Sequence, residues 1–278
     1  MKLFVTGATG FLGSHFLNLL AEHSAIEILA LRRNLESKPR IPLIKEPFWL
    51  TKQIDQINQD DLVGVDVIVH FAAHSMYPPY DTLDKCLYWN LTAPLQLFNE
   101  AVKVGVNKFV VAGSCFEYGL SGEEFDFIPV EASLKPTLTY AASKAASSIV
   151  FYQFAIQHQV KLSYHRIFQI FGEGEAASRL WPSLKKAAIA GEDFSMTEGE
   201  QIRDFIAVEE VAHYFIKACL KVDLISGIPK FYNVGSGKPQ SILEFSEYWW
   251  NKWQAKGKLL KGILPYREGE VMRYVPKI

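Results

Sequence analysis

The sequence contains few of the residues that mark a disulfide-bonded or metal-binding protein. Its 278 residues include only three cysteines, Cys86, Cys115 and Cys219, an odd number at wide spacings. No C-x-x-C pair is present, so we expect neither a disulfide framework nor a cysteine-based metal centre. Reduced thiols of this kind are typical of a cytoplasmic protein.

The sequence also lacks a long apolar run and an excess of charge of one sign. No stretch approaches the roughly 18 apolar residues of a membrane span, and glycines interrupt the start of the chain, where a signal peptide needs continuous apolar residues. Lysine and arginine together number 29, and aspartate and glutamate 30, for a net charge of −1. This balance argues against a nucleic-acid partner or a membrane anchor and favours a small-molecule partner.

What the sequence does contain is an alternation of strands and helices. Hydrophobic residues make up 49% of the chain, and short β-rich runs separate helical stretches. These runs span residues 2–6, 27–31, 65–71, 108–112 and 162–167. Several are apolar on both faces, as expected of strands covered by helices on either side. The pattern predicts an α/β fold with a doubly wound parallel sheet of the Rossmann type.

Glycine and proline punctuate the second part of the chain, which predicts a small substrate-binding region at the carboxyl end. We predict a dinucleotide-binding domain formed by residues 1–166, with residues 206–235 returning to it. The substrate-binding region then comprises residues 167–205 and 236–278.

A glycine-rich turn follows the first predicted strand and precedes a helical stretch. Its glycines let the backbone approach a pyrophosphate, whose charge is met by free N–H groups and the helix dipole. Tight turns alone also need glycine, but the strand and helix on either side favour dinucleotide binding. The cofactor-binding residues predicted here are Gly7, Thr9, Gly10, Phe11, Leu12 and Gly13.

Two arginines, Arg32 and Arg33, follow the second predicted strand. A carboxylate at this place would accept hydrogen bonds from the ribose 2′-hydroxyl of NAD, whereas guanidinium groups suit the 2′-phosphate of NADP. NADP is therefore favoured over NAD. A solvated basic loop that continues to Lys38 and Arg40 is the alternative interpretation.

Tyr140 and Lys144 lie four positions apart in an alanine-rich stretch, which is predicted to be helical and to place them on one face. A nearby ammonium group favours phenolate and eases proton exchange between a tyrosine and a carbonyl oxygen. Such pairs are also common on solvated helices. Here, however, the apolar run 110–112 leads to Ser114, at the edge where open α/β sheets bind ligands. We predict that Ser114, Tyr140 and Lys144 are catalytic.

These motifs together resemble the extended short-chain dehydrogenase/reductases, the epimerase/dehydratase group that acts on nucleotide sugars. The resemblance covers almost the whole chain. The matching features are the glycines at 7, 10 and 13, His70-Phe71-Ala72-Ala73, Asn90, Ser114 before Tyr118-Gly119, Tyr140 with Lys144, Arg203-Asp204-Phe205-Ile206, Asn233-Val234-Gly235 and Arg267 with Gly269-Glu270. It implies an NAD(P)-dependent enzyme with a nucleotide-sugar substrate.

The resemblance also implies which residues contact the ligands. Besides the glycine turn and the two arginines, the cofactor contacts are Phe71, Ala72, Ala73, Asn90, Tyr140 and Lys144. The residues expected to contact the substrate are Ser114, Cys115, Phe116, Glu117, Gln169, Arg179, Arg203 and Arg267. No metal ligand is expected.

Some of these residues have a structural alternative. In similar enzymes two arginines hold the sugar diphosphate, but Arg203 and Arg267 are also consistent with surface ion pairs with Asp204 or Glu268.

Asn90 is also consistent with a helix cap, Glu117 with a buried hydrogen-bonded acid and Cys115 with a small core residue. Gln169 departs from the asparagine that relatives usually carry there.

Members of this group divide into 4-epimerases, 4,6-dehydratases and 4-ketoreductases. Dehydratases carry an Asp-Glu pair after the hydroxyl residue, and Cys115 and Phe116 occupy those places here. The segments 113–119, 179–182 and 270–274 resemble reductases of the abequose and paratose synthase type. The expected reaction is therefore NADPH-dependent reduction of the C4 keto group of a nucleoside-diphosphate 4-keto-6-deoxyhexose. It would serve deoxysugar biosynthesis for lipopolysaccharide or capsule.

Two other functions stay open. An NAD-dependent nucleoside-diphosphate-hexose 4-epimerase would retain NAD through purification. A non-catalytic NADP sensor or scaffold would use the same fold, although the three predicted catalytic residues are all present.

Relatives commonly form homodimers through the helices that follow Asn90 and include Tyr140. Apolar positions compatible either with such an interface or with packing on the sheet are Leu95, Phe98, Val150 and Phe154.

Overall fold

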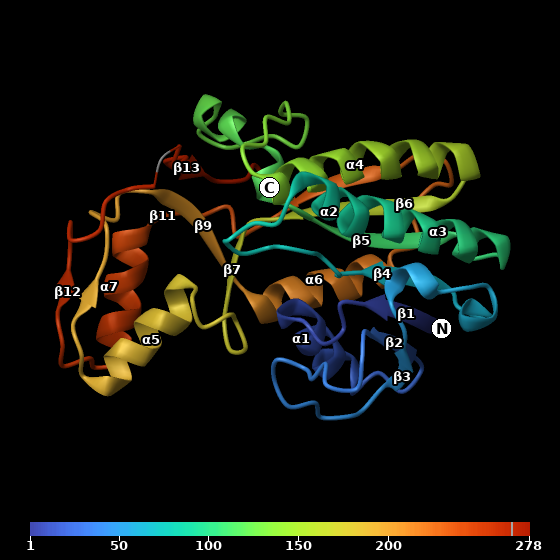
Figure 1. The fold of residues 1–278 in the computed structure, drawn as a ribbon, viewed down its shortest axis with the longest axis horizontal. Helices are drawn as coiled ribbons and strands as arrows, with labels where there is room; N and C mark the ends of the chain where they lie inside the picture. Colours follow the sequence, from blue (N-terminus) through green and yellow to red (C-terminus); the bar gives the residue numbers. More distant parts are fainter. Residues whose placement is uncertain (268) are drawn as a thin grey trace.

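A parallel sheet forms the centre of the larger lobe (Figure 1). The computed structural model describes residues 1–267 and 269–278. The seven strands of this sheet are all parallel, in the order β10-β6-β5-β4-β1-β2-β3. Their bounds are β1 Lys2–Thr6, β2 Glu27–Arg32, β3 Phe48–Thr51, β4 Val67–His70, β5 Lys108–Ser114, β6 Lys161–Ile167 and β10 Lys230–Val234. The predicted fold class is confirmed.

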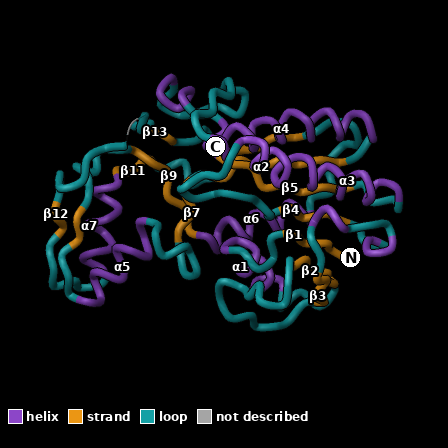
Figure 2. The backbone as a smooth tube through the Cα atoms, viewed as in Figure 1, coloured by secondary structure: helices purple, strands orange, loops and turns teal. Residues whose placement is uncertain are grey.

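Helices lie on both sides of this sheet, as Figure 2 shows. The α-helices are α1 Phe11–Leu20, α2 Leu83–Leu87, α3 Ala93–Lys103, α4 Thr139–His158, α5 Leu180–Ala190, α6 Val208–Leu220 and α7 Ile242–Lys252. Leu3 and Val5 pack with α1 and α6, whereas Phe4 packs with α3 and α4. Successive residues of β1 therefore enter opposite layers, and this explains why both faces of the central strands are apolar.

Short helical turns complete the larger lobe and position parts of the site. The 3₁₀ turns are Ile54–Gln56, Asp60–Leu62, Cys115–Glu117 and Leu120–Glu124, and a π-helical turn, Tyr88–Thr92, joins α2 to α3.

Two strands of the large sheet were not predicted. β3 was not among the predicted runs, but it pairs in parallel with β2, placing Thr51 opposite Arg32. It is a four-residue edge strand with an exposed Phe48, too short for its alternation to stand out. β10 pairs with β6 at the other edge and is largely half-buried. The predicted run 65–71 is also longer than β4, while β5 extends beyond its predicted end to Ser114.

A second lobe holds the remaining strands (Figure 1). β9 (Ile202–Ala207) lies between β11 (Pro239–Ser241) and β13 (Arg273–Tyr274), and β7 (Gln169–Phe171) also pairs with β9. β8 (Phe194–Ser195) pairs with β12 (Leu259–Leu260) beside α5 and α7. The chain returns to the larger lobe as α6 and β10. The domain boundaries stay a prediction, which this strand pairing supports.

The helices α3 and α4 carry the apolar positions considered for a dimer. Phe98 and Phe154 are buried against the sheet, so they cannot form an outer surface. Ile149 and Tyr152 of α4 are instead exposed, at 63% and 47%. Across the described residues, no helix is both long enough and apolar enough to cross a membrane.

Candidate active site

The glycine turn packs closely on neighbouring backbone. Gly7 has a φ of +66°, and a Cβ there would lie 2.6 Å from the Ala72 amide nitrogen. A Cβ on Gly13 would lie 2.2 Å from the carbonyl oxygen of Gly7. Gly10 begins α1 in an extended conformation and has no side chain to cap the helix. The first N–H groups of α1 are thus left for an external acceptor.

The turn fits a dinucleotide pyrophosphate. Its side-chain-free backbone leaves room for close approach, and the helix start supplies donors and the positive end of a dipole. The end of β4 is fixed beside it, because the Thr6 hydroxyl lies 2.8 Å from His70 Nδ1 and accepts a hydrogen bond from the Ala72 N–H. The predicted cofactor contacts directly after β4 are half-buried; they are Phe71, Ala72 and Ala73.

The end of β2 presents one fixed arginine and one exposed arginine. Arg32 Nε donates to Thr51 Oγ1 at 3.0 Å, and the guanidinium lies 5.3 Å from the centre of the Trp49 ring. Both partners belong to β3, the strand that the sequence analysis missed. Arg33 is exposed to solvent. Arg32 is thus held at this strand end by its contacts with β3.

The hydroxyl predicted to be catalytic lies where β5 ends. Ser114 is 8% exposed, its backbone N–H donates to Glu117 Oε1 at 2.8 Å, and its Oγ accepts from the Phe116 N–H at 3.2 Å. These bonds fix the 3₁₀ turn that follows. The hydroxyl therefore stands at the carboxyl edge of the sheet, as predicted.

Tyr140 and Lys144 both lie in the first part of α4 and are buried. Burial raises the pKa of Tyr140, and a hydrogen bond with the Ser114 side chain acts in the opposite direction. Burial lowers the pKa of Lys144 to about 8, and the Glu117 carboxylate opposes that change. Lys144 Nζ donates to the Ala112 carbonyl at 2.8 Å. The structure thus gathers the three predicted catalytic residues at one sheet edge, with a neutral phenol beside a hydroxyl.

Asn90 does not cap a helix, so that alternative is wrong. It lies within the π-helical turn, and its Oδ1 accepts from the His74 N–H at 2.6 Å. Its Nδ2 donates to the His74 carbonyl and to Ser143 Oγ, at 3.1 and 2.9 Å. Ser143 in turn donates to the Tyr140 carbonyl. Asn90 therefore ties the loop after β4 to the turn of α4 that carries the tyrosine, and π-helical turns are frequent at functional sites.

Two residues of the 3₁₀ turn are enclosed by the fold. Glu117 is fully buried, and its Oε2 accepts from Arg166 Nε at 2.8 Å. The buried, hydrogen-bonded acid is the arrangement observed, and Glu117 does not line an open pocket. Cys115 is also buried, at 5% exposure, and burial raises its pKa to about 12, so the thiol is neutral. Phe116 is half-buried beside Tyr274.

The loop before α5 forms a cluster that the sequence analysis did not identify. Arg179 Nε donates to Glu175 Oε1 at 3.2 Å, and its guanidinium lies 5.7 Å from the centre of the Tyr77 ring. Burial raises the pKa of Glu175 to about 7 although Arg179 lowers it. Glu175 and Arg179 lie outside a helix, so the four-residue spacing of helical ion pairs gives no signal for their contact in the sequence. Gln169 lies at the start of β7 and is half-buried.

The two arginines predicted to bind a diphosphate differ in environment. Arg203 is buried and pairs with Glu270 at 2.8 Å, so an ion pair with Asp204 is wrong. Asp204 instead accepts hydrogen bonds from backbone N–H groups, including that of Ser236 at 2.7 Å. Arg267 is exposed. Its suggested partner Glu268 lies outside the described residues.

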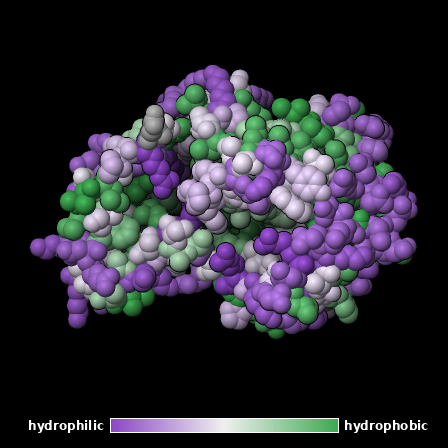
Figure 3. All heavy atoms as spheres, in the orientation of Figure 1, coloured by the Kyte–Doolittle hydropathy of each residue, from purple (hydrophilic) through white to green (hydrophobic). Residues whose placement is uncertain are grey.

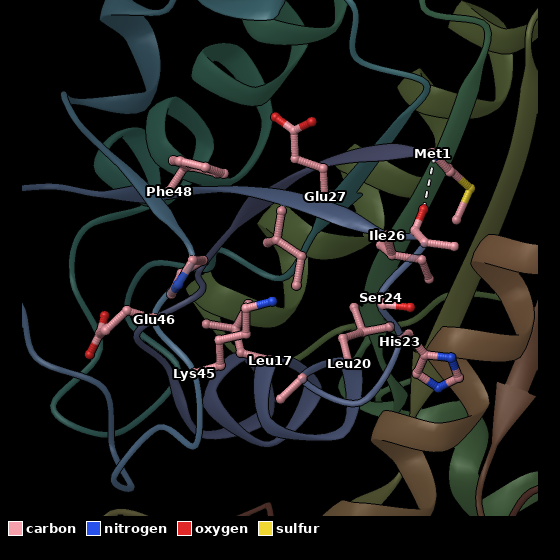
Figure 4. A pocket seen from close by; sticks show the side chains of 14 residues that line it. Met1, Leu17, Leu20, His23, Ser24, Ile26, Glu27, Lys45, Glu46 and Phe48 are labelled. Atoms are coloured by element: carbon pink, nitrogen blue, oxygen red, sulfur yellow. Dashed lines mark hydrogen bonds between the residues drawn. The ribbon is translucent and has the colours of Figure 1, made fainter.

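A hollow separates the two lobes on the face shown in Figure 3. Burial raises the pKa of Tyr80, and the charges of Arg179 and Arg267 oppose that change, so both cations act on one phenol. A separate hollow of about 380 Å³ is lined by the carboxyl end of α1 and the amino ends of β1 and β2, including Leu20 and Phe48 (Figure 4). It lies at the sheet edge opposite the glycine turn and is not part of this site.

The chain matches a known family over most of its length. The model of the NAD dependent epimerase/dehydratase family matches residues 3–235. The chain belongs to this family. Membership implies a nicotinamide dinucleotide as cofactor, and the glycine turn fits that group.

Several relatives span nearly the whole chain. A CDP-abequose synthase from Salmonella muenchen is 27% identical over 277 residues, covering 98% of this chain and 87% of the relative. A UDP-glucose 4-epimerase from Erwinia amylovora is 26% identical over 306 residues, covering 99% and 89%.

Solved structures share the fold. A UDP-N-acetylglucosamine 4-epimerase from Methanobrevibacter ruminantium M1, in complex with UDP-N-acetylmuramic acid, superimposes with a TM-score of 0.89 at 22% identity, covering 100% of this chain and 89% of that chain. A dTDP-glucose 4,6-dehydratase from Streptomyces venezuelae, with NAD bound, gives a TM-score of 0.79 at 21% identity, covering 100% and 88%.

Proposed function

We propose that the protein is a cytoplasmic reductase of deoxysugar biosynthesis. It reduces the C4 keto group of a nucleoside-diphosphate 4-keto-6-deoxyhexose with NADPH. The observation that carries this proposal is the combination of the Ser114, Tyr140 and Lys144 trio with an arginine held at the end of β2. The trio suits a carbonyl, and the arginine suits a cofactor with a 2′-phosphate, which serves reductions.

Each residue of the site has a separate role in the reduction. Bound NADPH supplies the hydride for C4. Tyr140 gives its phenolic proton to the keto oxygen, and the burial that raises its pKa keeps the acid form available at neutral pH. Ser114 donates a hydrogen bond that holds the same oxygen. The Lys144 ammonium stabilises the phenolate that remains and binds the nicotinamide ribose.

The residues of this site do not suit elimination of water. Dehydratases that resemble the chain carry an acid and a base directly after the hydroxyl residue, where this chain has Cys115 and Phe116. The Cys115 thiol is buried and its pKa is raised to about 12, so it cannot serve as a base at neutral pH. Phe116 has no ionisable group. Reduction without loss of water is therefore favoured.

The nucleotide sugar is supported by the named relatives and by two cations, Arg179 and Arg267, that act on the same tyrosine. Both the abequose synthase and the 4-epimerases carry a nucleotide-sugar name. Arg179 and Arg267 act on Tyr80 from two segments of the second lobe, and forked guanidinium groups suit a diphosphate.

A 4-epimerase is the second candidate. The relatives named UDP-glucose 4-epimerase, at 25% and 26% identity, favour it. An epimerase would use NAD catalytically and retain it. The end of β2 disfavours this function, because Arg32 replaces the carboxylate that accepts hydrogen bonds from the ribose of NAD.

A panel of nucleoside-diphosphate 4-keto-6-deoxyhexoses, assayed by the loss of NADPH absorbance, tests the proposal. We expect substrate-dependent oxidation of NADPH by the native protein. Tyr140→Phe should lower kcat at least about 100-fold, the usual size of a general-acid contribution, and leave NADPH affinity nearly unchanged because the ring stays. Failure with every sugar of the panel contradicts the proposal. Interconversion of hexoses without added cofactor would establish the epimerase instead.

We also propose a homodimer that buries the outer face of α4. Ile149 and Tyr152 are exposed apolar side chains on that helix, while the sheet-facing positions are already filled. Ile149→Asp should therefore convert a dimer to a monomer in light scattering, whereas Val222→Asp, at a residue 90% exposed elsewhere, should not. A native protein that is monomeric at micromolar concentration contradicts the dimer.

A further inference from the structure

A fully buried carboxylate lies directly beneath the catalytic trio and has no part in the proposed reaction. Glu117 is 0% exposed, and its Oε1 accepts hydrogen bonds from the Ser114 backbone N–H and the Tyr164 hydroxyl, both at 2.8 Å. Its Oε2 accepts from Arg166 Nε at 2.8 Å. Among the described residues, its three hydrogen-bond partners are all donors, which is the environment that suits a carboxylate.

Arg166 balances this charge and anchors it to distant segments. Its Nη1 donates to the Tyr118 hydroxyl at 3.1 Å and to the Val130 carbonyl at 2.9 Å. The Tyr118 hydroxyl in turn donates to Asn233 Oδ1 at 2.7 Å. The ion pair therefore joins the turn after β5 to β6, to residue 130 and to β10, and it cannot shift without breaking several buried hydrogen bonds.

Tyr164 connects the carboxylate to the helix that carries Lys144. Its hydroxyl lies 2.8 Å from Glu117 Oε1 and 3.2 Å from the Lys144 carbonyl oxygen, and Lys144 Nζ lies 5.9 Å from the centre of its ring. Burial beside Glu117 raises the pKa of Tyr164, so the phenol stays protonated. A Cβ on Gly113 would lie 2.2 Å from the Tyr164 ring and 2.8 Å from Glu117 Oε1, so a glycine is needed for this approach.

We propose that Glu117 is a positioning residue: through Tyr164 and the Ser114 backbone it fixes Lys144 and Ser114, and it places a buried negative charge at the hydroxyl of Tyr164, over whose ring the Lys144 ammonium lies. The role replaces the substrate contact expected from the sequence. It rests on the proposed function only in that the fixed groups are those of the reductase site.

Glu117 stands out among the titratable groups around Lys144, because the others are neutral. The other titratable groups near Lys144 and Tyr140 are His70 on β4, Cys115 in the 3₁₀ turn, Tyr164 on β6 and Tyr77 in the loop after β4. Burial lowers the pKa of His70 to about 3, so it is neutral, as are the thiol and the phenols. Glu117 is then the negative charge that opposes the burial of the Lys144 ammonium.

Glu117→Gln tests this role because the amide keeps the shape and one acceptor oxygen but removes the charge. We follow the ¹³Cε signal of Lys144 against pH in protein labelled at lysine, with Lys144→Met to assign the signal. The measurement needs neither cofactor nor substrate. We expect the midpoint of Lys144 to fall by about one pH unit, the lower end of the effect of a nearby opposite charge.

Two matched variants separate charge from packing. Glu175→Gln neutralises another buried carboxylate outside this network and should leave the Lys144 midpoint unchanged. Tyr164→Phe removes the hydrogen-bonded link but keeps the charge, so the midpoint should move less than in Glu117→Gln. Arg166→Lys retains the balancing charge and serves if Glu117→Gln fails to fold. Its Lys144 midpoint should then stay near the native value.

A Lys144 midpoint that does not change in folded Glu117→Gln overturns the proposal. A Lys144 midpoint in Arg166→Lys that shifts by as much as the loss of a charge predicts overturns it as well. A lowered midpoint in a protein that reduces no keto sugar would uphold the role of Glu117 and reject the proposed function. The two proposals therefore fail independently.

Discussion

The proposed preference for NADPH rests on Arg32 and can be measured. Its Nε is bound to Thr51 Oγ1 at 3.0 Å and its guanidinium lies 5.3 Å from the centre of the Trp49 ring. Within the described residues its two terminal nitrogens have no hydrogen-bond partner, so they are free for the 2′-phosphate. Arg33 is exposed and is not held in this way. We therefore expect Arg32→Ala to weaken NADPH binding far more than Arg33→Ala.

The expected size follows from the number and kind of bonds. A hydrogen bond to a charged group contributes about 1.5–3 kcal/mol. Since each 1.4 kcal/mol is tenfold in affinity, Arg32→Ala should raise the Kd for NADPH about 10- to 150-fold. An exposed ion pair is worth about 0–1 kcal/mol, so Arg33→Ala should raise it less than about sixfold. NADH lacks the phosphate, and its Kd should change by less than about twofold in both variants.

Isothermal titration with NADPH and NADH at two salt concentrations provides the assay. The NADPH loss in Arg32→Ala should shrink as salt rises, because screening weakens the native contact. Thr51→Val serves as a matched control, since it removes the anchor of Nε but keeps both charges, and should cost a few-fold at most. Equal losses for NADPH and NADH would refute the phosphate contact. A larger loss in Arg33→Ala would assign it to the other arginine.

Three further changes have defined outcomes. Gly13→Ala places a Cβ 2.2 Å from the Gly7 carbonyl and should abolish dinucleotide binding in titration; retained affinity contradicts the close turn. Asn90→Ala leaves the His74 N–H without its acceptor and should lower the free energy of unfolding in urea by about 1–3 kcal/mol, although the Ser143 hydroxyl keeps its bond to the Tyr140 carbonyl. Burial lowers the pKa of His165 to about 3. Below about pH 6.5 only the unfolded chain gains a proton at this residue, so the native state becomes less stable as the pH drops. His165→Phe should reduce the pH dependence of the free energy of unfolding. Equal slopes for the native protein and the variant between pH 7.5 and 5.5 contradict this prediction.

The central fold could be predicted because its strands are buried on both faces. Val67 to Val69 and Phe109 to Val111 enter two helix layers, and the resulting apolar runs are visible in the sequence. The edge strands β3 and β10 have one or both faces partly open, so their composition resembles a loop. The missed β3 matters for function, because Thr51 and Trp49 hold Arg32.

In the site, residues set by nearby spacing could likewise be predicted, whereas partners far apart in the sequence could not. The glycine turn and the pair Tyr140 and Lys144 are set by spacing along one helix or turn, and the sequence predicted their places. The partners of Glu117 and Asn90 come from other elements: Arg166 lies 49 positions and His74 16 positions away. Spacing carries no signal at such separations, so a buried acid and a helix cap remained alternatives until the fold placed their partners.

The two arginines predicted to bind the diphosphate, Arg203 and Arg267, differ in how freely they could bind it. Arg203 already donates to Glu270 and to the carbonyls of Ile202 and Val271, so its charge is matched inside the protein. A diphosphate bound to it must compete with Glu270, whereas the exposed Arg267 has no such competition from that carboxylate. Glu270 also stays close to Arg267, because its backbone N–H donates to the Arg267 carbonyl at 3.1 Å. We therefore expect the substrate diphosphate to engage Arg267 first and Arg203 only once it displaces Glu270.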